Sequence, residues 1–304
     1  MAPSVSLSAF AKINLDLRIL GIRSDGYHDL RTILQTLALS DRVTVTARRG
    51  PLVITCDDPD VPTDRTNLVW KAASLLRRLG ARKAGPPRDL AIDLRKRIPS
   101  QAGLGGGSAD AAATLLALNR LWKLDLDATT LARIGARLGA DVPFFFAGGT
   151  ALGLGRGDDI YPLDELPVVH VVVLRPGFGV STVDAYGWYD AEIRRPRREP
   201  HLRRAPAGWP SWSESLRNDL EPAVTKHHPA IGRLRQSLMD AGAVFAAMSG
   251  SGSAVFGLFE RADAARRTAQ DLARPGWAVV CTKTVNRREY ARRLEVLGSG
   301  ERGL

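Results

Sequence analysis

The sequence predicts an α+β protein with two lobes. Along most of the chain, apolar residues alternate between a period of two, which is typical of strands, and a period near 3.6, which is typical of helices. The chain has 304 residues, 44% of them hydrophobic, which is enough for one large core or two of ordinary size. We place the lobe boundary near 155–167 and expect an N-terminal lobe over 1–160 and a C-terminal lobe over 161–304.

The first half of the chain contains a strand with one apolar and one polar face. In residues 11–20, four apolar side chains alternate with polar ones, which predicts a half-buried strand whose polar face meets solvent. That polar face carries Lys12, Asn14, Asp16 and Arg18. By the same criteria we expect strands at 41–47 and 90–95 and a helix over 66–80 that ends at Gly80.

A glycine-rich stretch, PSQAGLGGGSAD at 99–110, follows the predicted strand and precedes an alanine-rich helix, for which Ser108 is the expected cap. Glycines before a helix can direct several N–H groups at an anion, and the helix dipole favours negative charge there. The spacing matches neither G-x-G-x-x-G nor a P-loop, and no G-x-S-x-G elbow occurs. Two interpretations of this stretch are possible at this point: a phosphate-binding loop, or a tight connection that binds no ligand.

The second half continues with mixed elements. We expect a helix over 128–138 that ends at Gly139, strands at 168–177 and 253–260, and a long Arg/Pro/Trp-rich excursion over 194–213. No leader or membrane span is evident, so we expect a cytoplasmic protein. Cys56 and Cys281 have no pairing or ligand spacing and are expected to fill the core.

The net charge of +11 raises the question of an anionic partner. Much of this charge lies in two arginine-rich runs, at 194–204 and 287–293, and such runs are usually solvated faces. No nucleic-acid-binding module accompanies them. The charge therefore favours an anionic small molecule, with nucleic-acid binding as a remote alternative and no membrane partner.

The stretch PSQAGLGGGSADAA resembles the phosphate-binding motif of the GHMP kinases. Five further segments resemble motifs of the same superfamily in order: AKINLDLRILGIRSDGYHDLRT, GADVPFF, GGTALGLGRGDDI, NDLEP and MSGSGSAVFGLF. The resemblance implies the two-lobed GHMP kinase fold and phosphorylation, by ATP, of the 2-hydroxyl of a cytidine diphosphate-linked methylerythritol. The alternative is a GHMP kinase of the mevalonate or homoserine type. The protein is expected to be a monomer or a homodimer.

The resemblance also implies the catalytic pair. Asp141 matches the general base of these kinases, and Lys12 matches the lysine that orients the hydroxyl and stabilises charge on the transferred group. A nearby lysine keeps a carboxylate ionised. From the residues alone, Asp141 could instead cap a helix at Pro143, and Lys12 could be a solvated strand residue.

Substrate binding is expected around Asn14 and the G-Y-H segment. By resemblance, Tyr27 stacks on cytosine and His28 hydrogen-bonds its edge, which supplies the discrimination that stacking lacks. Tyr186 is assigned to the opposite face of the base, with Thr182 nearby. Without the resemblance, Tyr27 and His28 would be read as a surface turn and Tyr186 as a core aromatic.

ATP is expected to bind through the glycine loop, Lys96 and Asn67. Mg²⁺ is expected to arrive with ATP, because no acidic cluster is dedicated to it, although Asp110 could contribute through water. Lys96 could equally be an exposed charge at a strand end, and Ser249–Gly252 is expected to pack as a second glycine turn against the loop. The loop residues assigned to ATP are Pro99, Ser100, Gln101, Ala102, Gly103, Leu104, Gly105, Gly106, Gly107, Ser108 and Ala109.

Overall fold

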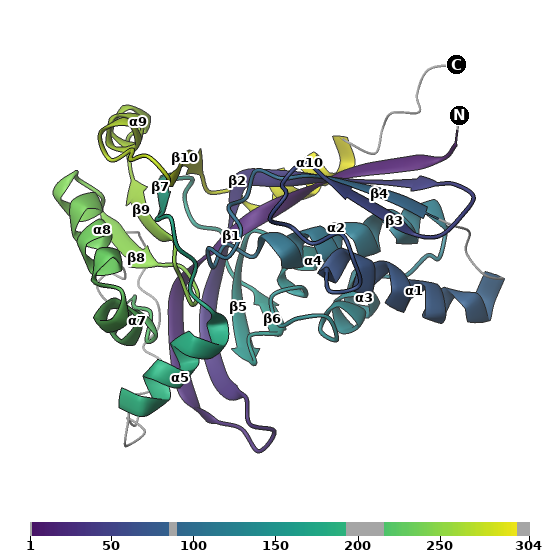
Figure 1. The fold of residues 1–304 in the computed structure, drawn as a ribbon, viewed down its shortest axis with the longest axis horizontal. Helices are drawn as coiled ribbons and strands as arrows, with labels where there is room; N and C mark the ends of the chain where they lie inside the picture. Colours follow the sequence, from purple (N-terminus) through teal and green to yellow (C-terminus); the bar gives the residue numbers. More distant parts are fainter. Residues whose placement is uncertain (1, 85–89, 193–215, 297–304) are drawn as a thin grey trace.

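The computed structural model describes residues 2–84, 90–192 and 216–296 and contains two sheets (Figure 1). The larger sheet has the order β3-β4-β2-β5-β6, with β1 paired to β2, and the smaller has the order β10-β7-β9-β8. The strands of the larger sheet are β1 (Ser4–Ile22), β2 (His28–Ala47), β3 (Val53–Cys56), β4 (Leu90–Arg95), β5 (Thr150–Gly155) and β6 (Asp159–Pro162). Those of the smaller sheet are β7 (His170–Arg175), β8 (Phe245–Met248), β9 (Val255–Phe259) and β10 (Ala278–Lys283).

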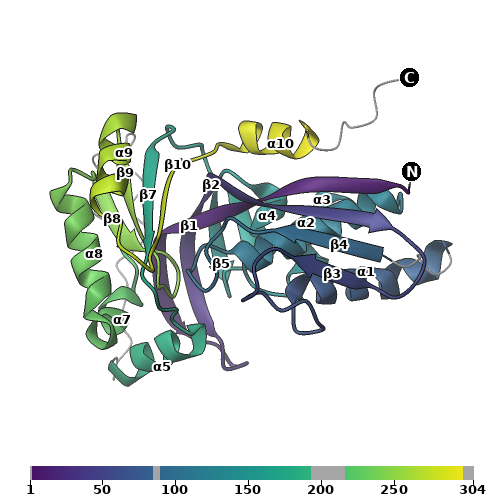
Figure 2. The ribbon, with the colours of Figure 1, turned by 45° about the horizontal axis from the view of Figure 1, so that its top comes forward.

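The described helices pack in two groups. Together with the two sheets they give the predicted α+β class. Figure 2 shows α1 to α4 gathered beside the larger sheet, whereas α8 and α9 pack on the smaller one. The first group is α1 (Leu68–Ala84), α2 (Gly106–Leu121), α3 (Ala128–Gly135) and α4 (Phe144–Ala147). The others are α5 (Thr182–Glu192), α7 (Glu221–His227), α8 (Pro229–Asp240), α9 (Ala262–Asp271) and α10 (Arg287–Val296).

Strands β1 and β2 form a long antiparallel hairpin that runs along both sheets. Ile13 and Leu15 pack in one cluster with Val171 and Phe256 of the smaller sheet. The polar face of β1 is buried as well, since Lys12, Asn14, Asp16 and Arg18 are all at most 8% exposed. The alternative that Lys12 is a solvated strand residue is therefore wrong, because side chains of the same molecule cover this face.

Several predicted boundaries also change. Helix α1 continues past Gly80 to Ala84, and α3 ends at Gly135 rather than at residue 138. Cys56 is partly buried and packs against the larger core cluster, whereas Cys281 is exposed and does not fill the core as expected. The excursion predicted over 194–213 lies outside the described residues. Among the helices that are described, none has the length and apolar character needed to cross a bilayer.

Candidate active site

The glycine loop leads into α2 through three residues with left-handed backbone, Gln101, Gly103 and Gly105. Gly103 and Gly105 both have φ +72°, a conformation that favours glycine over residues with a side chain. Gly105 is the N-cap of α2 and no side chain caps the helix, so the expectation that Ser108 is the cap was wrong. The first N–H groups of a helix have no acceptor within it. At this end of α2 those groups are available to an anion.

Neighbouring segments hold the loop in place. The amide of Lys12 donates to the carbonyl oxygen of Leu104 at 3.0 Å, and Ser249 Oγ donates to that of Gly103 at 2.9 Å. A β-carbon on Gly103 would lie 2.0 Å from the Ser249 carbonyl oxygen. The predicted second glycine turn, Ser249–Gly252, thus packs directly on the loop, and Asn218 of the NDLEP segment donates to Gly250 O at 2.7 Å.

Lys12 and Asp141 form an ion pair beside the loop. Lys12 Nζ lies 3.2 Å from Asp141 Oδ2 and donates to Asn14 Oδ1 at 2.6 Å. The lysine side chain is 3% exposed and the aspartate side chain 38%, so the carboxylate is open on one side. Asp141 is not the N-cap of α4, since that position is Pro143. An open carboxylate held beside a buried ammonium is suited to accepting a proton from a ligand hydroxyl.

The stem of Lys12 runs under the glycine loop. A β-carbon on Gly105 would lie 3.0 Å from Lys12 Cγ and 3.0 Å from Phe145 Cζ. The loop and the Lys12–Asp141 pair are therefore adjacent, which is the geometry that transfer between a bound phosphate and a bound hydroxyl requires.

The tip of the β1–β2 hairpin meets α5. The rings of His28 and Tyr186 are stacked with centroids 4.6 Å apart, and His28 Nε2 lies 2.8 Å from Asp190 Oδ1. Tyr27 is 58% exposed, and the guanidinium carbon of Arg156 lies 5.4 Å from its ring centroid. Because Arg156 covers one face of Tyr27, the other face is the one left for a flat ligand.

One face of α5 carries the residues that reach the site. Thr182, Tyr186 and Asp190 are spaced four residues apart, so they lie on one side of the helix. Thr182 Oγ1 lies 3.0 Å from Ser251 Oγ of the second glycine turn. Burial raises the pKa of Tyr186 and the charge of Asp141 adds to the effect, so this ring lies within electrostatic range of Asp141.

Lys96 belongs to a buried charge cluster under the start of α2. Its ammonium contacts Asp41 and lies 2.5 Å from Asp110 Oδ2, and its side chain is 6% exposed. Lys96 is therefore not an exposed charge at a strand end. The two carboxylates raise the pKa of Lys96 against the effect of burial, whereas burial raises the pKa of Asp110 to about 7. A β-carbon on Gly106 would lie 3.6 Å from Lys96 Nζ, so the cluster underlies the N-terminal end of α2.

Asn67 is placed at the start of α1. Its Oδ1 accepts from the amide of Val69 at 2.8 Å and its Nδ2 donates to the Pro62 carbonyl at 2.6 Å. These bonds give Asn67 a capping role. A β-carbon on Gly107 would lie 3.9 Å from the side chain of Leu68, the residue after Asn67. Asn67 is thus close to the loop, while its predicted contact with ATP stays a prediction.

Sequence reasoning missed Asp41, Arg156, Asp190 and Asn218. Asp41 accepts from Lys96 and from the amides of Arg97 and Ile98, which fixes the entry to the glycine loop. The spacing of Asp190 from Tyr186 was a usable signal, because residues four apart share a helix face. Asp41, Arg156 and Asn218 are placed by contacts between segments that are distant in sequence, and the local sequence pattern gives no signal for such contacts.

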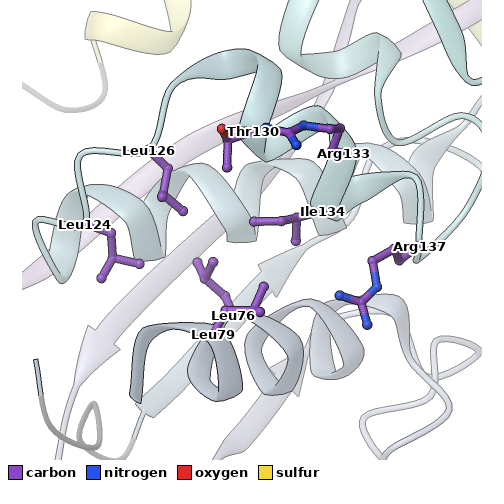
Figure 3. A pocket seen from close by; sticks show the side chains of 8 residues that line it. All are labelled: Leu76, Leu79, Leu124, Leu126, Thr130, Arg133, Ile134 and Arg137. Atoms are coloured by element: carbon purple, nitrogen blue, oxygen red, sulfur yellow. Dashed lines mark hydrogen bonds between the residues drawn. The ribbon is translucent and has the colours of Figure 1, made fainter. Parts of the chain in front are cut away.

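A separate pocket of about 350 Å³ lies between α1 and α3 (Figure 3). Leucines and Ile134 line it, with Arg133 and Arg137 at its side. None of the predicted site residues lines it. Within the described part of the chain, no group of three or more His, Cys, Asp or Glu side chains is arranged to hold a metal ion.

Comparison with known proteins identifies the family of the chain. The N-terminal domain of GHMP kinases matches residues 67–149 and their C-terminal domain matches 207–276. A solved homoserine kinase from Cytophaga hutchinsonii, 20% identical with a TM-score of 0.66 over 95% of this chain and 97% of that one, shares the fold. The fold and the matches to both domains define a GHMP kinase.

More similar relatives narrow the assignment. The 4-diphosphocytidyl-2-C-methyl-D-erythritol kinase of Moorella thermoacetica is 42% identical over 92% of this chain and 99% of its own, and that of Citrifermentans bemidjiense is 40% identical over 92% and 99%. A crystal structure of 4-(cytidine 5'-diphospho)-2C-methyl-D-erythritol kinase, 37% identical, has a TM-score of 0.75 over 92% of this chain and 98% of that one. The chain belongs to the 4-diphosphocytidyl-2-C-methyl-D-erythritol kinase family.

Proposed function

We propose that this chain transfers the γ-phosphoryl group of ATP to the 2-hydroxyl of 4-diphosphocytidyl-2-C-methyl-D-erythritol. The Lys12–Asp141 pair, 3.2 Å apart beside the uncapped start of α2, is the observation that carries the proposal. The names of the relatives supply the substrate. Our division of the chain into lobes at 1–160 and 161–304 is part of the same proposal.

In this reaction Asp141 accepts the proton of the 2-hydroxyl. The resulting oxygen forms a bond to the γ-phosphorus of ATP, and the bond from that phosphorus to the β–γ bridging oxygen breaks to release ADP. Lys12 stabilises charge on the transferred group. Asn14 holds the Lys12 ammonium in place through its 2.6 Å hydrogen bond.

We assign the phosphates of ATP to residues 99–109. The amides of Gly106, Gly107 and Ser108 open the helix and supply N–H groups, and the helix dipole favours the negative charge. Mg²⁺ would come bound to ATP and neutralise its phosphates, since the described residues offer no dedicated cluster. Lys96 lies too deeply among carboxylates to serve as a free cation and would act on the phosphates from beneath the loop.

We assign the base to the tip of the hairpin. The open face of Tyr27 would stack on cytosine, Tyr186 would face it from α5, and His28 would contact its polar edge. Thr182 would lie near the linkage between base and polyol. The two unpaired cysteines suit a reducing compartment, and we place the enzyme in the cytoplasm.

An ADP-release assay tests the proposal. The purified chain with Mg²⁺ and ATP should turn over 4-diphosphocytidyl-2-C-methyl-D-erythritol, and the product should carry one added phosphoryl group by mass spectrometry. Mevalonate and homoserine should give no ADP above background. Turnover of either one in place of the cytidyl substrate would overturn the proposed substrate.

A further inference from the structure

The ion pair between His28 and Asp190 points to a function beyond packing. Asp190 lies on the last turn of α5, and His28 is the first residue of β2 at the tip of the hairpin (Figures 1 and 2). His28 Nε2 and Asp190 Oδ1 are 2.8 Å apart, and the histidine side chain is 12% exposed. Two segments that are distant in sequence thus meet through the side chain that we assign to the base.

A carboxylate fixes one nitrogen of the ring. An ionised aspartate only accepts hydrogen bonds, so His28 Nε2 carries the hydrogen that Asp190 receives. Nδ1 is then the only ring nitrogen left for a ligand. Stacking on Tyr186 at 4.6 Å and the edge of Tyr189 at 6.3 Å restrict rotation of the imidazole.

We propose that Asp190 is a specificity-determining positioning residue, which holds His28 so that its Nδ1 reads cytosine and rejects uracil. This inference rests on the proposed function. Cytosine has an unprotonated N3 and an amino group at position 4, whereas uracil has an N–H and a carbonyl oxygen there. A ring that carries its hydrogen on Nε2 presents Nδ1 as an acceptor. At position 4 that acceptor pairs with the amino group of cytosine and has no hydrogen to offer the carbonyl oxygen of uracil, so the proposal places Nδ1 at position 4 of the base.

A neighbouring acidic residue, Glu192, provides a comparison for the contact between Asp190 and His28. Glu192 lies on the same helix, but it pairs with Lys226 at 3.0 Å instead of facing the hairpin. Glu192→Gln therefore removes the same charge from α5 without touching His28 and serves as a matched control. Asp190→Ala removes the acceptor, and Asp190→Asn keeps an acceptor oxygen but adds a donor that allows the other tautomer of His28.

Calorimetric binding of CDP and of UDP tests the proposal. We expect the wild type and Glu192→Gln to prefer CDP, and Asp190→Ala to lose about tenfold of that preference, which is the size of effect expected when one hydrogen bond with a charged partner is removed. Asp190→Asn should fall between them, and the KM for ATP should change less than twofold in every variant. A CDP to UDP ratio in Asp190→Ala within twofold of the wild type would overturn the inference.

The protonation state of His28 provides a second measurement that packing alone does not affect. The ¹⁵N shifts of the imidazole, assigned with a His28→Gln variant, should show a protonated Nε2 in the wild type and a mixture of tautomers in Asp190→Ala. A wild type with an unprotonated Nε2 contradicts the proposal. If the wild type neither binds CDP nor phosphorylates the cytidyl substrate, the proposed function fails instead, which separates the two results.

Discussion

Ser249 donates a hydrogen bond to the carbonyl oxygen of Gly103 at 2.9 Å and thereby joins the turn at 249–252 to the glycine loop. The backbones of the two segments are also in close contact, since a β-carbon on Gly103 would collide with the carbonyl oxygen of Ser249. Asn218 supports the second turn by donating to Met248 O at 2.9 Å and to Gly250 O at 2.7 Å. The loop assigned to ATP is thus held by segments from the far end of the chain.

Gly103→Ala should destabilise the protein by about 2 to 4 kcal/mol, because φ is +72° and the new methyl group would lie 2.0 Å from Ser249 O. Gly107→Ala is the matched control, since its β-carbon meets nothing closer than 3.9 Å and alanine favours a helix by up to about 1 kcal/mol. Urea unfolding measures both. Equal stabilities of the two variants would contradict the close packing described here.

Asp141→Asn should lower kcat by about 10² to 10⁴ fold, because the amide cannot accept the proton of the acceptor hydroxyl. The fold should survive, since the Asp141 side chain is 38% exposed. Steady-state ADP release measures the effect, with Asp240→Asn as a control of equal charge on the exposed end of α8. A variant that keeps more than a tenth of the wild-type kcat would exclude Asp141 as the base.

Lys12→Met should lower kcat at least about 10²-fold, because it removes the buried positive charge between the loop and Asp141. It should also cost about 1 to 3 kcal/mol of stability, since Asn14 Oδ1 loses its donor in a buried position. Single-turnover phosphoryl transfer and thermal unfolding report the two effects. Lys71→Met, on the exposed side of α1, should change neither quantity, and equal kinetics for both variants would refute the assignment.

Asp110 should make stability depend on pH. Burial raises its pKa to about 7 in the folded chain, whereas an unfolded aspartate titrates near 3.9. Between these values the folded chain keeps a proton that the unfolded chain has released, so stability falls as the pH rises from about 4 to 7. Asp110→Asn cannot titrate. Its unfolding free energy relative to the wild type should therefore increase over this window.

Urea unfolding at several pH values between 4 and 8 measures that difference. Asp60→Asn, in an exposed loop, controls for the loss of a carboxylate and should show a difference that stays level with pH. A level difference for Asp110→Asn as well, or one that decreases with pH, would contradict a raised pKa at this position.

Periodicity predicted the strands and helices, because local burial on one face leaves its period in the sequence. It could not show that the polar face of β1 is buried, since what covers Lys12 and Asn14 comes from distant segments such as Thr32 and Asp141. The same limit applies to Lys96, whose partners Asp41 and Asp110 flank it from β2 and α2. Resemblance pointed to Lys12 and Asp141, and spacing on α5 could have pointed to Asp190.

Strand β1 has a consequence for attempts to divide the molecule. Leu7, Ile13 and Leu17 of this one strand belong to three different core clusters, which lie in both halves of the chain. A fragment that begins at residue 161 would lack Ile13 and Leu17 and would expose the apolar surface they cover. We expect such a fragment to aggregate when expressed alone, and the intact chain to denature in a single cooperative transition.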